Sequence, residues 1–121
     1  MTTCDETGRC LATCTALGEV RQYDIRAQIR HISNTQVTQK EMMLTHILTS
    51  PLDYNYLYTI TQEGHPIKLD RRKECGVVRK MTGSKGSIRD AKMFAQNGHE
   101  FLITGGCDRY LRVYDATQDL R

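Results

Sequence analysis

Asp108-Arg109-Tyr110-Leu111-Arg112-Val113-Tyr114-Asp115 is the stretch that decides the fold, because it is the third copy of one pattern. The first copy is Leu17-Gly18-Glu19-Val20-Arg21-Gln22-Tyr23-Asp24, and the second is Glu63-Gly64-His65-Pro66-Ile67-Lys68-Leu69-Asp70. The aspartates that close the copies lie 46 residues apart (70 minus 24) and then 45 apart (115 minus 70). The chain therefore carries an internal repeat.

A second set of residues keeps the same period. It consists of a leucine ladder and, two positions later, a threonine ladder: Leu11, Leu57, Leu102, Thr13, Thr59 and Thr104. A period of about 45 residues that ends in a hydrophobic residue and Asp is typical of β-propeller blades. A single blade cannot bury its own faces, so we expect the repeats to stack and function to lie on the rims of a disc.

Hydrophobic alternation and turn residues predict the strands. We expect them at 9–15, 19–24, 43–48, 56–61, 65–70, 75–80, 87–94, 100–104 and 109–114. Asn97-Gly98 favours a tight hairpin because both residues tolerate positive φ. The polar segment Ser33–Met42 has no periodicity, and we expect it to link two blades.

These strands amount to about two and a half to three four-stranded blades, in units of approximately 1–32, 43–80 and 87–115. A closed propeller typically has about four to eight blades. We therefore expect an all-β fold in which residues 1–121 form the C-terminal part of a longer propeller. The alternative is that copies of the chain associate. Because open blade edges are unpaired, we expect the isolated chain to associate or aggregate, unless it is cut from a complete disc.

The composition is that of a globular protein, with 39% hydrophobic and 26% charged residues and no run long enough to cross a membrane. The polar segment Met1–Arg9 does not resemble a signal peptide. The five cysteines contain no C-x-x-C pair, so we expect reduced thiols inside a cell rather than a zinc site. They are Cys4, Cys10, Cys14, Cys75 and Cys107.

The net charge of +3 is unevenly distributed. Between Arg71 and Lys92 there are eight basic and two acidic residues, a local +6 that leaves −3 elsewhere. Such a concentration favours a polyanionic partner such as RNA, although a solvated rim would look the same. We expect Arg71-Arg72-Lys73 to form a solvated turn on the opposite face.

The candidate partner-binding residues are Lys85, Arg89 and Arg109, on or beside the face where turns and links between blades meet. Guanidinium groups there could clamp phosphates or carboxylates. The alternative is structural: Arg89 and Arg109 would pair with Asp90 or Asp108 to hold the blade together.

The third unit resembles a WD repeat at Thr104, Asp108 and Tyr114-Asp115, which we expect to be structural within the blade. In that family His, Ser or Thr, Asp and Trp form a hydrogen-bonded tetrad. Ser87 and Tyr114 replace the His and the Trp, so the full tetrad cannot form, and we expect Asp108 to accept backbone N–H groups of its own turn instead. In the first two units we expect Gly18 and Gly64 at the place of Asp108.

Two longer strings are similar to those of the nucleolar WD-repeat factors of large ribosomal subunit assembly. They are Gly18–Gln28, which contains Arg26-Ala27-Gln28, and Lys85–Arg89 followed by Asp108–Val113. The resemblance covers Ala16–Asp115 and departs at Ala95–Gly98, where the family usually has a His-Pro turn. It implies a seven-bladed propeller on the pre-60S particle, contacts with its proteins and with rRNA, release by an AAA ATPase, a role in rRNA processing, and a nucleolar or nuclear location.

Catalytic motifs are absent from the sequence. The four histidines have no metal-ligand spacing, and Gly83–Ser87 has the wrong spacing for a phosphate loop. We expect no enzymatic activity, no cofactor and no small-molecule substrate. The predicted function is a scaffold in large-subunit biogenesis; the alternatives are a WD-repeat adaptor in another complex and an enzyme on a propeller scaffold.

Overall fold

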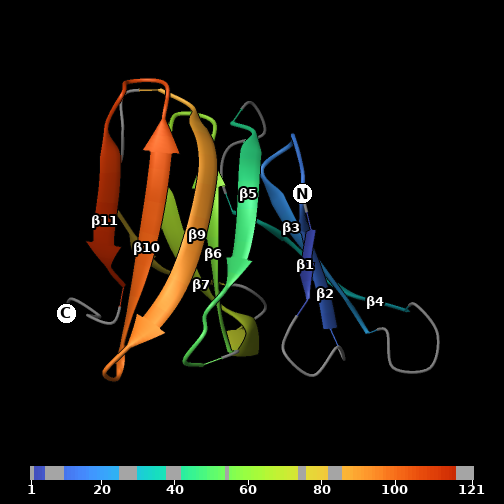
Figure 1. The fold of residues 1–121 in the computed structure, drawn as a ribbon. Helices are drawn as coiled ribbons and strands as arrows, with labels where there is room; N and C mark the ends of the chain where they lie inside the picture. Colours follow the sequence, from blue (N-terminus) through green and yellow to red (C-terminus); the bar gives the residue numbers. More distant parts are fainter. Residues whose placement is uncertain are drawn as a thin grey trace.

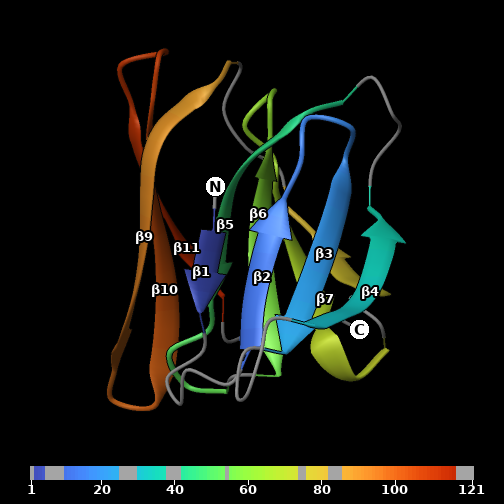
Figure 2. The ribbon, with the colours of Figure 1, turned by 90° about the vertical axis from the view of Figure 1, so that its right-hand side faces the viewer.

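The fold consists of three antiparallel sheets that stand side by side (Figures 1 and 2). The computed structural model describes residues 2–4, 10–24, 30–37, 42–53, 55–73, 76–81 and 86–116. Within these residues the only helix is a short 3-10 turn, η1 (Arg71–Lys73), so the all-β prediction is confirmed. The string Arg26-Ala27-Gln28 and the residue Lys85 lie outside the described residues.

Sheet A comes first and has the strand order β1-β2-β3-β4. Its strands are β1 (Thr2–Cys4), β2 (Cys10–Cys14), β3 (Glu19–Asp24) and β4 (Arg30–Gln36). Sheet B repeats this order as β5-β6-β7-β8. Its strands are β5 (Leu44–Thr49), β6 (Tyr56–Thr61), β7 (Pro66–Asp70) and β8 (Gly76–Lys80).

Sheet C has three strands within the described residues, in the order β9-β10-β11. They are β9 (Ile88–Gln96), β10 (His99–Gly106) and β11 (Leu111–Asp115). A two-residue turn at Asn97-Gly98 joins the first two, with φ of 53° and 78°, as the hairpin prediction required. The expected blade count is thus met by sheets of four, four and three strands.

The predictions missed two strands, β1 and β4. The segment 33–42 was expected to be a link, yet Ser33–Gln36 belongs to β4, which pairs with β3. The partners include Val20↔Thr35 and Glu19↔Gln36. An outermost strand exposes polar side chains and gains its order from backbone hydrogen bonds, so it leaves little hydrophobic alternation in the sequence.

Both ladders of the repeat are confirmed as structural registers. Leu11, Leu57 and Leu102 lie opposite the residue that precedes the closing aspartate in each sheet. The pairs are Leu11↔Tyr23, Leu57↔Leu69 and Leu102↔Tyr114. The threonines, two residues after the leucines, also have equivalent partners in the three sheets: Thr13↔Arg21, Thr59↔Ile67 and Thr104↔Arg112. The sequence repeat therefore corresponds to three structurally equivalent sheets.

The turn between the second and third strands has one geometry in all three sheets. Its last residue has positive φ: Gly18 (79°), Gly64 (92°) and Arg109 (70°). Glycine adopts this geometry without steric cost, whereas Arg109 incurs about 1–2 kcal/mol of backbone strain. This corrects the assignment of the two glycines to the place of Asp108: they occupy the place of Arg109, and Leu17 and Glu63 occupy that of Asp108.

Two cores lie between the sheets. Sheets A and B bury Ala12, Val20, Ile47, Leu57 and Leu69, together with neighbouring apolar residues. Sheets B and C bury the residues Ile60, Ile88, Ala91 and Leu102, with Leu48, Met93 and Tyr114 packed against them. Sheet B therefore buries both of its faces against its neighbours, and sheets A and C each bury one face against sheet B, as expected for stacked blades.

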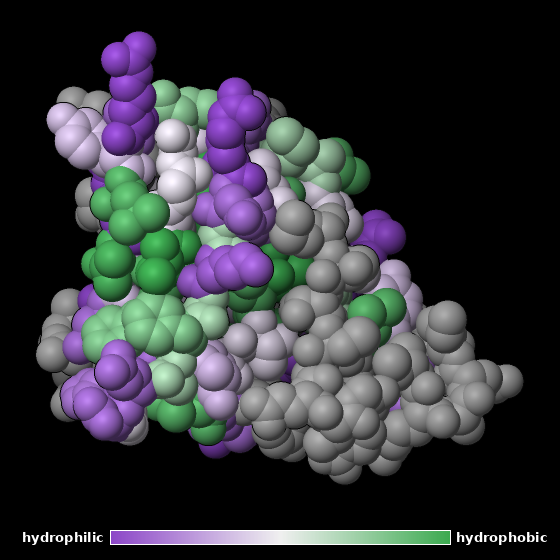
Figure 3. Space-filling view, viewed as in Figure 1, coloured by the Kyte–Doolittle hydropathy of each residue, from purple (hydrophilic) through white to green (hydrophobic). Residues whose placement is uncertain are grey.

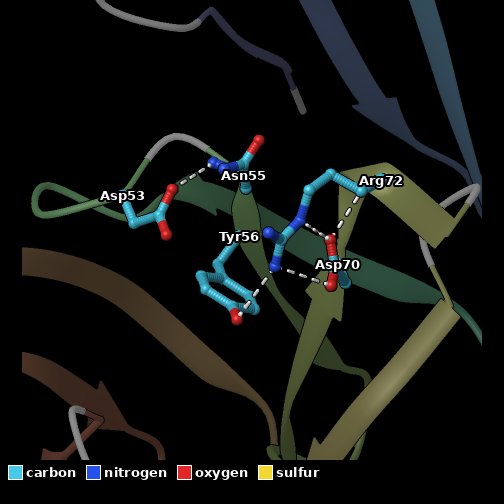
Figure 4. Close-up of polar contacts among 5 residues, drawn as sticks. All are labelled: Asp53, Asn55, Tyr56, Asp70 and Arg72. Atoms are coloured by element: carbon cyan, nitrogen blue, oxygen red, sulfur yellow. Dashed lines mark hydrogen bonds and ion pairs between the residues drawn. The ribbon is translucent and has the colours of Figure 1, made fainter.

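The closing aspartate of sheet B shows what this repeated residue does. Asp70 Oδ1 accepts hydrogen bonds from the backbone N–H of Arg72 at 2.9 Å and from its Nε at 3.1 Å (Figure 4). The guanidinium of Arg72 also reaches the hydroxyl of Tyr56 at 3.2 Å. The sequence predicts only a solvated turn at Arg71-Arg72-Lys73, which the structure shows as η1. Arg72 is exposed there, but its guanidinium also forms an ion pair with Asp70.

Candidate partner-binding face

The upper end of the molecule, at the top of Figure 1, is where the turns between second and third strands meet the links between sheets. Backbone hydrogen bonds join them, which confirms that these two classes of loop share one face. The bonds are Val37 N–H to Gly18 O (2.8 Å), Leu44 N–H to Thr15 O (3.2 Å), Gln62 N–H to Met43 O (2.7 Å) and Cys107 N–H to Ser87 O (3.1 Å).

The structure places two of the three candidate residues at the upper end of sheet C. Arg89 lies near the start of β9, Arg109 lies in the β10–β11 turn, and both are exposed. Hydrophilic side chains stand out from this end of the sheet in Figure 3. Lys85 lies in the link before β9, outside the described residues, so its role stays a prediction.

Asp108 organises the β10–β11 turn. Its Oδ1 accepts the backbone N–H of Tyr110 at 3.2 Å, as expected, and its Oδ2 pairs with Arg112 at 2.7 Å. The cation that holds this turn is therefore Arg112 on β11. Arg109 forms no ion pair or side-chain hydrogen bond among the described residues, which leaves its guanidinium available to a partner.

The other two sheets stabilise the same turn with a threonine. Thr15 Oγ1 accepts the backbone N–H groups of Leu17 and Glu19, each at 3.2 Å, and Thr61 Oγ1 accepts that of His65 at 3.1 Å. Sheet C has Gly106 at this position, so the carboxylate of Asp108 substitutes for the missing hydroxyl.

Of the remaining tetrad positions, Thr104 is buried, Tyr114 is half-buried and Ser87 is exposed. Burial raises the pKa of Tyr114, and the positive charge of Arg112 partly offsets that rise. The hydroxyl groups of Thr104 and Tyr114 do not reach hydrogen-bond geometry with each other or with any other described residue. Because the tetrad is incomplete, sheet C is stabilised by packing and by the hydrogen bonds of Asp108 in the β10–β11 turn.

Cys107 is a feature of this face that the sequence argument did not single out. Its Sγ lies 3.4 Å from Ser87 Oγ. The hydrogen bond with Ser87 and then the guanidinium of Arg89 lower the pKa of the exposed thiol. Burial instead raises the pKa of Cys14. The lowered pKa places the positive charge of Arg89 near Cys107 in the β10–β11 turn.

We expect iodoacetamide to alkylate Cys107 at least about tenfold faster than Cys14 near neutral pH, because the thiolate is the reactive form. Arg89→Ala should raise the pKa of Cys107 and slow its alkylation, whereas Lys92→Ala, farther along β9, should not. Peptide mass spectrometry across a pH series measures both rates. An unchanged pH profile in Arg89→Ala would show that the two side chains do not interact.

Within the described part of the chain, no group of three or more His, Cys, Asp or Glu residues could hold a metal ion. None of its helices has the length and hydrophobicity needed to cross a membrane.

No protein-family model matches the sequence, and no curated protein matches it. Among solved structures, a chain in the crystal structure of the mitotic checkpoint complex has the same fold, with a TM-score of 0.79 at 17% sequence identity. The match covers 98% of this chain and 34% of that chain, so this chain spans about a third of its length. That neighbour is a WD40 β-propeller, and the fold prediction of a partial WD-repeat propeller is confirmed. At this identity the likeness concerns the fold alone.

Proposed function

We propose that the chain is a non-catalytic scaffold that binds an acidic protein segment or RNA phosphates at the upper end of sheet C. The observation that carries this proposal is the exposure of Arg89 and Arg109 at the same end of one sheet. The fold supports it as well, because propellers of this kind present loops on rigid blades.

The geometry favours binding over a structural role for Arg109 in particular. Its backbone is held at a φ of 70°, although glycine occupies the equivalent position of the other two sheets. Asp108, the nearest carboxylate in sequence, is occupied by Arg112. Strained residues with free charged groups are concentrated at functional sites, so the arginine is better explained by a ligand than by the stability of the turn.

We propose further that the assembly served is the precursor of the large ribosomal subunit, with its proteins and rRNA as partners and an AAA ATPase as the releasing factor. The two strings that resemble nucleolar assembly factors support this. Gly18–Asp24 forms the last residue of the turn and all of β3, and Gly86–Arg89 leads into β9 at the candidate face. A nucleolar or nuclear location follows from this proposal.

A second candidate is an adaptor in another protein complex. The likeness to a chain of the mitotic checkpoint complex favours it, since that propeller is part of a multiprotein assembly. The two candidates share the upper face and differ only in the partner.

Charge reversal tests the site. We expect Arg89→Glu/Arg109→Glu to weaken association with precursor particles more than about tenfold, because each guanidinium that contacts a phosphate or carboxylate contributes about 1–3 kcal/mol. The control places two glutamates at the opposite end of the same hairpin, Gln96→Glu/His99→Glu. Binding curves from pelleting with purified particles give the affinities. Equal affinities for both variants would contradict the proposed site, as would intact binding of Lys85→Glu/Arg89→Glu.

A further inference from the structure

The outer edge of sheet B is an open strand edge. Strand β8 pairs with β7 on one side, and no strand among the described residues pairs with its other side. Met81 N–H donates to Pro66 O at 2.9 Å, so the next pair, Ile67 and Lys80, is a non-hydrogen-bonded pair of the antiparallel ladder. The backbone N–H and C=O of Lys80 therefore point away from β7, where another strand could pair with them.

The position of this edge does not depend on how far the chain extends. The sheets pack face to face, so sheets A and C cover the two faces of sheet B (Figure 1). A further sheet of a longer propeller would stack on the face of sheet A or of sheet C. It would leave the edge of β8 as it is, on the rim of the middle blade.

Two exposed valines lie at this edge. Val77 is 45% exposed, and Val78 is 41% exposed. The register passes from Lys68↔Arg79 directly to Leu69↔Val77, which makes Val78 the extra residue of a β-bulge. Both valines therefore oppose Leu69, and they present adjacent hydrophobic side chains on one stretch of the edge.

The bulge belongs to the repeat, but the side chains around it do not. Strand β4 of sheet A has its bulge at the same register position as β8. Three residues of β4 are equivalent to residues of β8 and differ from them in character: His31 to Val77, Ser33 to Arg79 and Asn34 to Lys80. Sheet B thus carries a hydrophobic residue and two cations at positions where the fold itself does not require them.

The surroundings of β8 are basic. Residues 71–80 contain five basic residues and one acidic residue, a local +4 (5 minus 1). On the strand itself Lys80 is exposed and Arg79 is half-buried, and the exposed Arg72 lies in η1 before it. An edge with adjacent hydrophobic side chains in a positive field fits an extended segment that carries hydrophobic and acidic residues. RNA would satisfy the charge but would make no use of the valines.

We propose that β8 binds an extended, acidic protein segment as a fifth strand of sheet B. The backbone of the segment pairs with the outward N–H and C=O groups of β8. Its hydrophobic side chains pack on Val77 and Val78, and its carboxylates lie beside Arg79 and Lys80. Main-chain hydrogen bonds supply affinity in such strand addition, and alternate side chains supply specificity. This rim site is separate from the face at the upper end of sheet C, and either site can exist without the other.

A labelled peptide of about eight residues, in which valine and glutamate alternate, is the probe for this site. Its fluorescence anisotropy measures binding to the chain. We expect Val77→Glu/Val78→Glu to weaken binding more than about tenfold, because the change removes the hydrophobic contact and places carboxylates against those of the peptide. Circular dichroism shows whether the variant is folded. If it is not, Arg79→Glu/Lys80→Glu is measured instead, with the same reading.

The matched control is Leu17→Glu/Leu52→Glu, which introduces the same charge at two exposed leucines away from β8. Leu17 is 55% exposed in the β2–β3 turn, and Leu52 is 48% exposed in the β5–β6 turn. This variant should bind the peptide as the unchanged chain does.

Hydrogen exchange tests the backbone pairing itself. Saturating peptide should slow the exchange of the Lys80 N–H more than about tenfold, because the added strand supplies an acceptor on the open side. The N–H of Met81 already donates to Pro66, so its exchange should change little.

Four results would overturn the proposal. A peptide that does not bind, or that binds both double variants alike, leaves the bulge and Lys80 as protection against strand pairing. Equal binding of a peptide in which valine alternates with lysine contradicts the acidic partner. Binding without protection of the Lys80 N–H contradicts strand addition. Displacement of the peptide by an equal concentration of a uridine oligonucleotide assigns the edge to RNA.

Discussion

Replacement of Glu100 with alanine is expected to lower the free energy of unfolding by about 3 kcal/mol, because it removes the buried carboxylate that accepts hydrogen bonds from two buried hydroxyl groups. Glu100 is buried on β10 and accepts hydrogen bonds from Tyr58 and Ser50 of sheet B. Tyr58 also donates to the backbone oxygen of Ala116 at 3.2 Å, and Lys68 Nζ approaches the same oxygen at 3.4 Å. The carboxylate thus joins sheets B and C at the lower end of their interface.

The control for this prediction is Glu100→Gln, which keeps the shape and one oxygen acceptor and should lose only about 1–2 kcal/mol. Glu63→Ala, in the exposed β6–β7 turn, should change stability by no more than about 0.5 kcal/mol. Urea denaturation followed by circular dichroism gives all three values. An alanine variant as stable as the glutamine variant would mean that the Tyr58 and Ser50 bonds do not hold the two sheets together.

Leu102→Ala should cost about 3–4 kcal/mol, since it removes a fully buried side chain from the core between sheets B and C. Leu102 is 0% exposed and packs with Ile60, Ile88 and Ala91. The surrounding backbone belongs to two sheets that are held by their own interstrand hydrogen bonds. The neighbouring residues therefore cannot move easily to fill the cavity. Urea denaturation measures this loss as well. If the slope of the unfolding free energy against urea concentration is unchanged, the variant keeps the same folded state.

Leu52→Ala is the matched control for the core. Leu52 is 48% exposed in the β5–β6 turn, and its truncation should change stability by no more than about 0.5 kcal/mol. Similar losses in the two variants would contradict the placement of Leu102 at the centre of the blade interface.

Much of the fold could be predicted from the sequence, because residues that recur with the repeat occupy the same position in the strand pairing of each sheet. Leu57 and Leu102 recur one period apart because each occupies the same register position and faces the preceding sheet. The strands β3 and β6 begin and end where alternation predicted. The outer strand β4 and the short strand β1 could not be found in this way, since their order comes from backbone pairing with β3 and β2 rather than from a hydrophobic pattern.

The candidate face was only partly predictable. The position of Arg89 and Arg109 at the upper end follows from the order of strands and turns. The pairing of Asp108 with Arg112 does not, because residues four apart across a turn meet only if the turn has the observed geometry. The positive φ of Arg109 and the contact between Cys107 and Ser87 also depend on backbone positions that no local pattern encodes.

The most direct test of the proposed function is whether the tagged chain, expressed in cells, sediments with large-subunit precursor particles and stays on them through a salt wash. A wash at about 0.5 M salt shortens the range of electrostatic attraction to a few ångströms, which removes proteins held only by long-range charge. The proposal predicts that the chain remains with the precursor particles after this wash. Recovery of the chain free of particles, or with an unrelated protein complex, would contradict it and would favour the adaptor in another assembly.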